Sequence, residues 1–219
     1  MELSLSEENY LKAIYHLSGG GKEQVATNAR SARLKTTPAS VSDMIRKLSE
    51  KGMLHYQKYQ GVTVSDEGAK SALRVIRKHR LWEVFLVSKL KFHWDEVHDV
   101  AEQLEHINSP LLIGRLDEFL GFPKFDPHGD PIPDEHGTID AKPKKVLDSM
   151  TAGERGKLVA LKDTEAGFLQ YLDRINLHLG DSVEVVEVME YDKSMLIEIK
   201  GLKQLSISQQ VASNLLLDV

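Results

Sequence analysis

Histidine and glutamate residues gather at helical spacing in two neighbouring stretches of the sequence. These residues are His79 and Glu83 in the first stretch, and His98, Glu102, Glu105 and His106 in the second. Residues three or four positions apart share one face of a helix, so each stretch can present its imidazole and carboxylate groups together. Such groups, without a thiolate, are ligands for a divalent ion such as Mn²⁺, Fe²⁺, Co²⁺ or Zn²⁺. One pair alone is typical of a solvated helix face, but two sets on adjacent helices favour a metal site.

The composition is that of an ordinary globular protein. The chain has 219 residues, of which 41% are hydrophobic and 28% are charged. It has no cysteine, which excludes disulfides, zinc knuckles, thiol catalysis and iron–sulfur clusters. No apolar run approaches the roughly 18 residues of a membrane span, and the acidic start does not resemble a secretory signal. We therefore expect a cytoplasmic protein with no membrane partner.

The net charge of -5 hides an asymmetry along the chain. Residues 1–80 carry 14 Lys and Arg against 8 Asp and Glu, which gives +6, whereas the remainder carries 14 against 25, which gives -11. A basic first third on an acidic body predicts a polyanionic partner for that end only.

The first 65 residues have the element order of a winged helix-turn-helix. We expect helices from Ser6, as N-cap, to Leu17, from Val25 to about Leu34, and from Ala39 to Lys51. Thr37 before Pro38 is a good start for the third helix. Two short strands, Leu54 to Lys58 and Val62 to Val64, then predict a hairpin, the wing.

The rest of the chain predicts a helical domain followed by a small β domain. Helices are expected from Asp66 to about Lys89, from Asp95 to Ile107 and from Ser109 to Leu120. Residues 121–143 hold five of the seven prolines and mark a boundary. Short β-type runs at Gly156 to Leu161, Ser182 to Met189 and Met195 to Ile199, with one helix at Ala166 to Leu177, then indicate an SH3-like β-barrel. The predicted fold is mainly α with a small β part, in three domains: a winged helix-turn-helix at 1–65, a helical domain with the candidate metal ligands at 66–142, and an SH3-like domain at 143–219.

Four blocks of sequence lie in a characteristic order: Glu8 to Tyr15, Arg77 to Glu83, Val97 to Asp99 with Glu105 and His106, and Asp126 to Pro133. Together they resemble the signature blocks of the diphtheria toxin repressor/MntR family of metal-activated bacterial transcriptional repressors. The resemblance spans nearly the whole chain, and its last part is similar to an SH3-like, or FeoA-like, domain. It implies a homodimer that binds double-stranded operator DNA, takes no organic substrate and controls metal-uptake genes.

The resemblance also implies two metal sites. Its primary site would use Asn9, Glu102, Glu105 and His106, and its ancillary site would use His79, Glu83, His98 and Asp163, with Glu165 as the alternative to Asp163. Glu102 stands where iron-type members have sulfur, and this hard oxygen favours Mn²⁺ over the alternative, Fe²⁺; Zn²⁺, Co²⁺ or Ni²⁺ would also occupy the site in vitro. Lys12 stands where some manganese-specific members place a glutamate ligand, which excludes their compact two-metal arrangement.

The position of the primary site suits a switch. A metal ion that bridges Asn9 on the DNA-binding domain and Glu105 on the dimerisation domain would fix the separation of two recognition helices in a dimer.

Polar residues around the third helix and the wing are the candidates for DNA contact: Thr37, Ala39, Ser40, Ser42, Asp43, Arg46, Lys47 and Lys58. Asp43 would repel phosphate, although it could accept a hydrogen bond from a cytosine amino group.

Two interpretations from other classes stay open. A metal-dependent hydrolase would use the same ligands, but no nucleophile motif accompanies them, and a metal-transport accessory protein is disfavoured by the winged helix. His128, between Pro127 and Gly129, is interpreted as a turn histidine rather than a ligand, and Trp82 and Trp94 as core or dimer-interface aromatics.

Overall fold

The computed structural model describes residues 3–25, 38–57, 61–140, 142–200 and 203–219. These fall into two compact units that are each assembled from several segments. Unit 1 contains residues 1–82, 102–115 and 133–139, and unit 2 contains residues 83–101, 116–132 and 140–219. Within the described residues, every helix is too short or too polar to span a bilayer.

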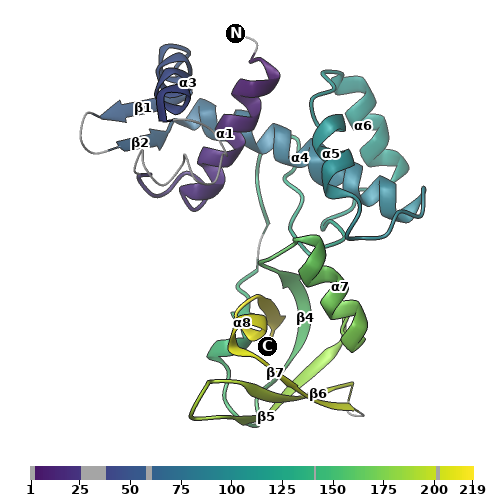
Figure 1. Ribbon diagram of the computed structural model, residues 1–219. Helices are drawn as coiled ribbons and strands as arrows, with labels where there is room; N and C mark the ends of the chain where they lie inside the picture. Colours follow the sequence, from purple (N-terminus) through teal and green to yellow (C-terminus); the bar gives the residue numbers. More distant parts are fainter. Residues whose placement is uncertain (1–2, 26–37, 58–60, 141, 201–202) are drawn as a thin grey trace. The chain divides into compact units, whose positions relative to one another are not determined.

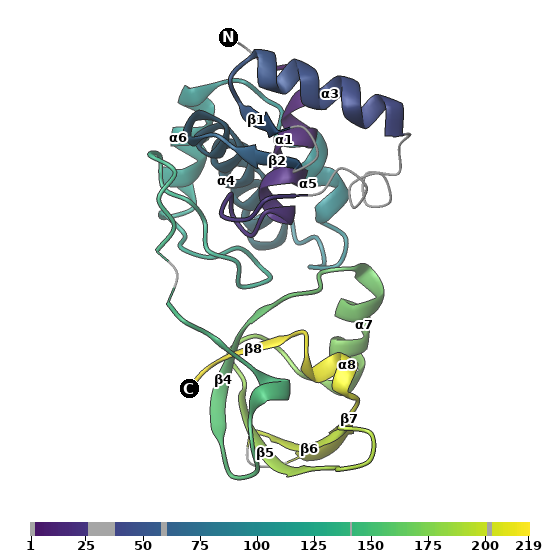
Figure 2. The ribbon, with the colours of Figure 1, turned by 90° about the vertical axis from the view of Figure 1, so that its left-hand side faces the viewer.

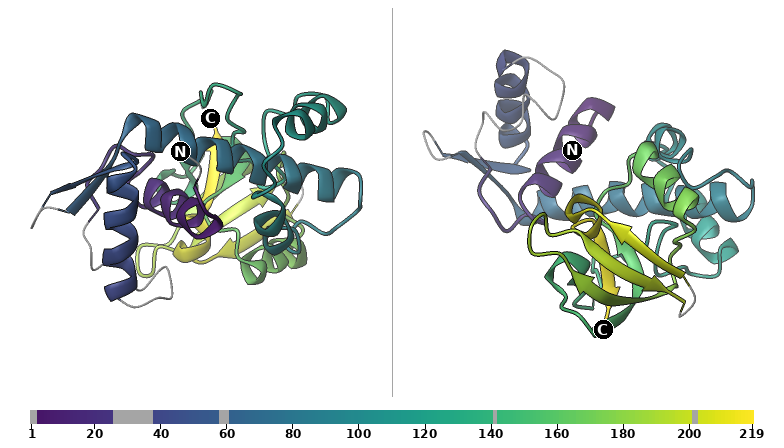
Figure 3. Two further views of the ribbon diagram at one scale, coloured as in Figure 1. Left: turned by 90° about the horizontal axis from the view of Figure 1, so that it is seen from above. Right: turned by 60° about the horizontal axis from the view of Figure 1, so that its bottom comes forward.

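In the N-terminal part of unit 1, the described residues form two helices and a hairpin around one apolar core. Helix α1 (Leu5–Leu17) begins after Ser4, whose side chain forms a reciprocal capping box with Glu7; the N-cap is therefore Ser4 and not the predicted Ser6. Helix α3 (Pro38–Glu50) precedes the antiparallel strands β1 (Leu54–Gln57) and β2 (Gly61–Val64). Figure 1 and the left panel of Figure 3 show α3 beside α1 and the hairpin. The shared core is built from Leu11, Ile14, Val41, Ile45, Leu48, Leu54 and Val62.

The predicted helix from Val25 to Leu34 lies outside the described residues except for Val25. This residue forms an antiparallel bridge with Val62 of the hairpin, so the chain is extended at the point where the helix was expected to begin. Thr37 and Lys58 also lie outside the described residues.

Helix α4 (Asp66–Ser88) is the longest element and starts where the sequence predicts. The Ser65 side chain accepts a hydrogen bond from the Gly68 N–H at 3.0 Å and caps it. The two following helices are α5 (His98–Leu104) and α6 (Pro110–Phe119). Helix α5 is shorter than the predicted span from Asp95 to Ile107, so Glu105 and His106 follow its last turn.

The C-terminal part of unit 2 is a six-stranded antiparallel sheet in the order β3-β8-β4-β5-β6-β7. The strands are β3 (Lys145–Val146), β4 (Arg155–Leu161), β5 (Ser182–Val188), β6 (Met195–Ile199), β7 (Lys203–Ile207) and β8 (Leu215–Asp218). Helices α7 (Ala166–Ile175) and α8 (Gln209–Ala212) accompany it (Figure 2). Among the described residues, β3 and β7 are the unpaired ends of the sheet, so the predicted barrel is not closed. Its core includes Leu158, Leu169, Val185, Ile197 and Leu217.

The proline-rich loop before this sheet is irregular, as predicted, but it is firmly attached. Asp126 accepts hydrogen bonds from the backbone N–H groups of His128 and Asp130, at 2.8 and 3.0 Å. The N–H of Leu161, on β4, donates to the carbonyl of His128 at 3.1 Å. Strand β4 therefore holds the turn that carries His128.

Candidate metal centre

The first candidate cluster lies in unit 1, where α1 meets the segment after α5. The Glu105 side chain is fully buried, and both of its oxygens accept hydrogen bonds from the Lys12 ammonium, at 2.7 and 2.8 Å. His79 Nδ1 lies 2.6 Å from Glu105 Oε2. A buried carboxylate thus has a cation and an imidazole as its partners, which is the pairing that a buried charge requires.

Burial raises the pKa of the Glu105 carboxyl, but the His79 hydrogen bond and the Lys12 charge outweigh this effect, so its pKa lies below the ordinary value. Glu105 is therefore an anion at neutral pH, the form in which a carboxylate binds a metal ion.

His106 connects this cluster to another residue of α1. Its Nδ1 lies 2.6 Å from Glu8 Oε2, and its Nε2 lies 3.7 Å from Glu105 Oε1. Glu102 is half exposed, 3.7 Å from the Lys12 ammonium, and Asn9 is exposed. Of the four predicted primary ligands, Glu105 and His106 are close together and Glu102 borders them. The side chain of α1 that contacts His106 is Glu8, and the sequence interpretation missed it.

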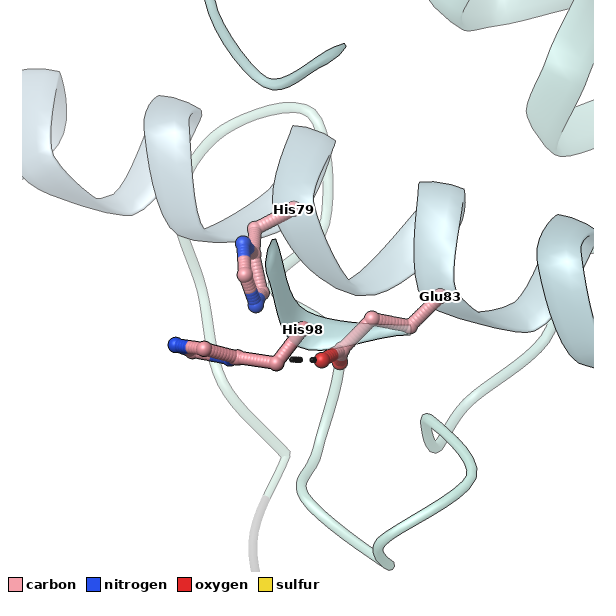
Figure 4. A group of neighbouring side chains, drawn as sticks. All are labelled: His79, Glu83 and His98. Carbon is pink, nitrogen blue, oxygen red and sulfur yellow. Dashed lines mark ion pairs between the residues drawn. The ribbon is translucent and has the colours of Figure 1, made fainter. Parts of the chain in front are cut away.

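A second cluster contains the predicted ancillary residues His79, Glu83 and His98. One possible ligand atom from each of the three lies within 4.8 Å of the other two. Figure 4 shows His79 and Glu83 on successive turns of α4, with His98 of α5 beside them. Glu83 is buried and His98 is half exposed, and Glu83 Oε1 lies 3.7 Å from His98 Nδ1. The spacing of four residues along α4 was sufficient to predict that His79 and Glu83 lie on one face of that helix.

A third cluster shares Glu83 and lies wholly within unit 2. Glu83, Asp126 and His128 are all buried, with possible ligand atoms within 4.8 Å of one another. His128 Nδ1 lies 3.8 Å from Glu83 Oε2, and its Nε2 lies 2.9 Å from the Trp94 carbonyl oxygen. Burial lowers the pKa of His128, but its interaction with Glu83 outweighs this and raises the pKa above the ordinary value. His128 does lie in a turn, yet its ring faces a carboxylate, and the turn interpretation missed that.

The separations distinguish direct hydrogen bonds from spacing that suits an ion. Ligands bound at about 2.0–2.2 Å to one ion are roughly 3–4 Å apart. The pairs Glu83–His98, Glu83–His128 and Glu105–His106, at 3.7 to 3.8 Å, have this spacing. Their oxygen and imidazole donors fit a borderline-to-hard divalent cation.

Asp163, the predicted fourth ancillary ligand, belongs to neither of the two clusters that contain Glu83. It accepts a hydrogen bond from the Glu165 backbone N–H at 2.9 Å and lines a pocket of about 320 Å³ with Tyr171 and Asn214.

Comparisons with known proteins cover the whole chain. Residues 2–62 match the family of iron-dependent repressor N-terminal DNA-binding domains. Residues 65–134 match the iron-dependent repressor metal-binding and dimerisation domain. Residues 145–219 match the FeoA domain. The iron-dependent repressor IdeR of Mycobacterium leprae is 30% identical over 182 residues, which are 82% of this chain and 75% of that protein. The chain belongs to the iron-dependent repressor family.

Solved structures agree with this family assignment. A manganese-dependent transcriptional repressor in complex with manganese is 33% identical, with a TM-score of 0.88 over 96% of this chain and 98% of that one. ScaR with bound Cd²⁺ is 29% identical, with a TM-score of 0.82.

Some relatives match over only part of their length. The chain spans 57% of Mycobacterium tuberculosis IdeR, and 19% of a probable metal transport system membrane protein of Chlamydia trachomatis that is 40% identical over 86 residues. The family consists of transcriptional repressors, which disagrees with the hydrolase alternative.

The repressor family's DNA-binding domain includes helix α3, whose outward face carries several predicted DNA contacts. The exposed residues there are Ala39, Ser40, Ser42, Asp43, Arg46 and Lys47. Asp43 pairs with Arg46 and with Lys47, each at 2.8 Å. Hydrogen bonds from Lys47 and Arg46 hold the pKa of Asp43 below its ordinary value. Because two cations neutralise Asp43, its negative charge does not dominate this face.

Proposed function

We propose that this chain is a transcriptional repressor that binds operator DNA as a homodimer when it is loaded with Mn²⁺, and that it controls metal-uptake genes. The observation that carries the proposal is the contact between α1 and the end of α5. Glu8 and Lys12 of α1 reach His106 and Glu105, so the candidate metal ligands lie directly against the DNA-binding domain.

The switch follows from this contact. The primary site is formed by Glu102, Glu105 and His106 with a side chain of α1, for which Asn9 is implied by the family and Glu8 is favoured by its distance to His106. A bound divalent ion supplies positive charge that holds these carboxylates together. Residues of α1 and of the segment after α5 are then restrained as one body, which stabilises one arrangement of the DNA-binding helices.

A second site is formed around Glu83. The ancillary set proposed from the sequence is His79, Glu83, His98 and Asp163, and the geometry supports its first three members. It also supports Asp126 and His128 as ligands on the other side of Glu83.

Manganese is favoured by the type of ligand. Glu102 and Glu105 are hard donors that suit Mn²⁺, whereas raw affinity follows the Irving–Williams order and is greater for Co²⁺, Ni²⁺ and Zn²⁺. Selectivity therefore arises in activation: Zn²⁺ prefers four tetrahedral ligands, whereas Mn²⁺ accepts more oxygens. Iron(II) is the alternative activator, which the relationship to IdeR supports.

The DNA interface uses α3 and the wing. Arg46 and Lys47 contact phosphates, and Ser40, Ser42 and Asp43 face the bases. We include Ala39 because it is exposed at the start of α3, and Thr37 and Lys58 on the basis of the sequence alone.

Homodimer formation uses apolar side chains on and after α6. Leu111 is 68% exposed, Phe119 is 62% exposed and Phe122 is 59% exposed. Large exposed apolar groups of this kind mark an interface.

The three matched ranges support three functional domains: 1–65 as a winged helix-turn-helix, 66–142 for dimerisation and metal binding, and 143–219 as an SH3-like domain. The two compact units cut across this division because α4 and α5 each contribute residues to both.

The experiment is a metal-dependent DNA-binding titration. A duplex is selected from a random pool with Mn²⁺-loaded protein, and its affinity is then measured by fluorescence anisotropy with Mn²⁺, Fe²⁺, Zn²⁺ or a chelator at one fixed salt concentration. We expect tight binding with Mn²⁺ and weak binding with the chelator. Glu105→Gln should lose the metal response, whereas Glu118→Gln, on the exposed side of α6, should keep it. Equal affinity with and without metal would overturn the proposal.

The same titration distinguishes the two candidates on α1. Glu8→Gln should weaken the Mn²⁺ response more than Asn9→Ala if Glu8 is the ligand, and the reverse order would assign the role to Asn9.

A further inference from the structure

The Lys12 ammonium is the cation that lies beside Glu102 and Glu105. Its nitrogen is 2.7 and 2.8 Å from the two oxygens of Glu105, and 3.7 Å from Glu102 Oε1. Only 13% of the Lys12 side chain is exposed, and Glu105 is completely buried. This ammonium therefore serves as the counter-ion of a carboxylate that has no access to water.

We propose that Lys12 is an internal competitor of the metal ion: it must leave Glu105 before the ion binds there, and it thereby sets the metal concentration at which the repressor responds. This inference rests on the proposed function, because it assumes that Glu105 is a metal ligand. It adds the residue that determines the apparent affinity of that site.

Charge repulsion opposes simultaneous occupation by the ammonium and a metal ion. An ion bound at about 2.1 Å to either Glu105 oxygen would lie within roughly 5 Å of an ammonium that stays hydrogen-bonded to both oxygens. Two cations at such a distance repel strongly in a site shielded from water. The ion therefore binds only to the fraction of molecules in which Lys12 has moved away from Glu105. The apparent dissociation constant for the metal is inversely proportional to that fraction.

The position of Lys12 on α1 gives the exchange a second consequence. Lys12 by itself joins α1 to Glu105 with one positive charge, and its neighbour Glu8 joins α1 to His106. A divalent ion replaces the first link by bonds to several ligands at once. Metal binding would therefore exchange one contact of α1 for another, and the difference in free energy between the two contacts would contribute to the coupling between metal binding and DNA binding.

The test compares Mn²⁺ binding by the full chain and its variants, with free Mn²⁺ followed by electron paramagnetic resonance. Lys12→Met removes the ammonium and keeps the stem, and Lys12→Gln leaves an amide that can still donate to Glu105. We expect one binding step to become roughly 10- to 100-fold tighter in both variants. Lys70→Met, which removes an exposed lysine of α4, is the matched control and should bind like wild type. Unchanged or weaker Mn²⁺ binding by folded Lys12→Gln would overturn the proposal.

A measurement on the wild-type chain keeps the test decisive if both Lys12 variants fail to fold. Acetylation of lysines is followed by mass spectrometry with and without Mn²⁺. Lys12 should react slowly without the metal and at least about tenfold faster with it, because displacement exposes the amine, whereas Lys70 should react equally in both. If Mn²⁺ fails to accelerate the reaction of Lys12, the competition does not occur.

These outcomes are independent of DNA binding. A chain that shows the predicted Mn²⁺ and acetylation behaviour but binds DNA equally with and without metal would retain the Lys12 competition and lose the proposed repressor switch. A metal-dependent DNA response with no effect of the Lys12 substitutions on Mn²⁺ binding would keep the proposed repressor switch and overturn the Lys12 competition.

Discussion

Replacement of Gly129 by alanine tests whether strand β4 positions the His128 side chain. Gly129 has φ +85°, and an added Cβ would lie 2.0 Å from the Val159 carbonyl oxygen and 2.7 Å from Ala160 Cα. Both of these are backbone atoms of β4, at a bulge in its pairing with β8. The adjacent hydrogen bond from Leu161 N–H to the His128 carbonyl anchors the same turn. Alanine at position 129 must therefore push the turn away from the strand.

The expected loss of stability has a backbone part and a clash part. The left-handed backbone costs a non-glycine residue about 1–2 kcal/mol, which the lower entropy of the unfolded alanine chain offsets by about 0.4–1 kcal/mol. The clash then adds about 1–3 kcal/mol for overpacking and about 0.5–1.5 kcal/mol for the hydrogen bond to His128. Together these terms span about 2–6 kcal/mol, and we expect Gly129→Ala to lower the free energy of unfolding by about 4 kcal/mol, near the middle of that range.

Gly153→Ala is the matched control because it has the same backbone requirement without the clash. Its φ is +88°, and nothing lies within 4 Å of its added Cβ, so we expect a loss of about 1 kcal/mol. Urea denaturation in chelator, followed by tryptophan fluorescence, gives both values. Mn²⁺ titration of each folded variant should show weaker binding only for Gly129→Ala, since that substitution moves His128 away from Glu83. Equal losses of stability in the two variants would refute the role of β4.

Four further predictions concern other side chains. Trp94→Phe removes the indole N–H that donates to Asp173 at 3.0 Å, and thermal denaturation should show a loss of about 1 kcal/mol; no change would mean that this bond to α7 is not stabilising. A hydrogen bond to Asp95, aided by Asp173 and Glu96, raises the pKa of His93, so the contribution of His93 to stability should be complete below about pH 6.5 and disappear as pH rises through the raised pKa. A pH-independent difference in melting temperature between wild type and His93→Gln would contradict the His93 assignment. Hydrogen bonds from Gln170 and His93 lower the pKa of Asp95, so the contribution of Asp95 to stability should disappear as pH falls below about 4. Glu102→Cys introduces sulfur and should shift DNA-binding activation from Mn²⁺ toward Fe²⁺, and an unchanged activation ratio would show that residue 102 does not set the metal preference.

Local signals in the sequence predicted the elements that depend on local physics. Helix α4 begins after the capping residue Ser65, and the hairpin turns where Gly61 supplies a positive φ of 117°. Strand β8 was missed because its pairing is distant: it pairs with β4, more than fifty residues earlier in the chain. Strand β7 was also missed, although it pairs with the preceding strand β6. Leu215, Leu216 and Leu217 also carry no turn signal or clear alternation that would separate a strand from a buried helix.

The candidate ligands also divide into those that local spacing predicts and those that depend on contacts between distant parts of the chain. His79 and Glu83 follow from their spacing along one helix, so the sequence was sufficient. The choice between Glu8 and Asn9 depends on the rotation of α1 about its axis, because adjacent helical residues point about 100° apart. His128 depends on the attachment of its turn to β4 and on the stacking of its ring with Trp94, with ring centroids 6.1 Å apart. Neither contact leaves a local pattern in the chain.

Glu83 limits how the ligands around it can be used. Its Oε1 lies 3.7 Å from His98 and its Oε2 lies 3.8 Å from His128, so each histidine faces a different oxygen of one buried carboxylate. Because both groups share Glu83, and Asp126 belongs only to the group that contains His128, Glu83 would have to bridge two ions or serve one ion at a time. The two sides also differ in preorganisation, because His128 is buried and held by the Trp94 carbonyl whereas His98 is half exposed. We therefore expect an ion on the His128 side to order fewer side chains, so the entropy of ordering should favour that side as the first to be filled.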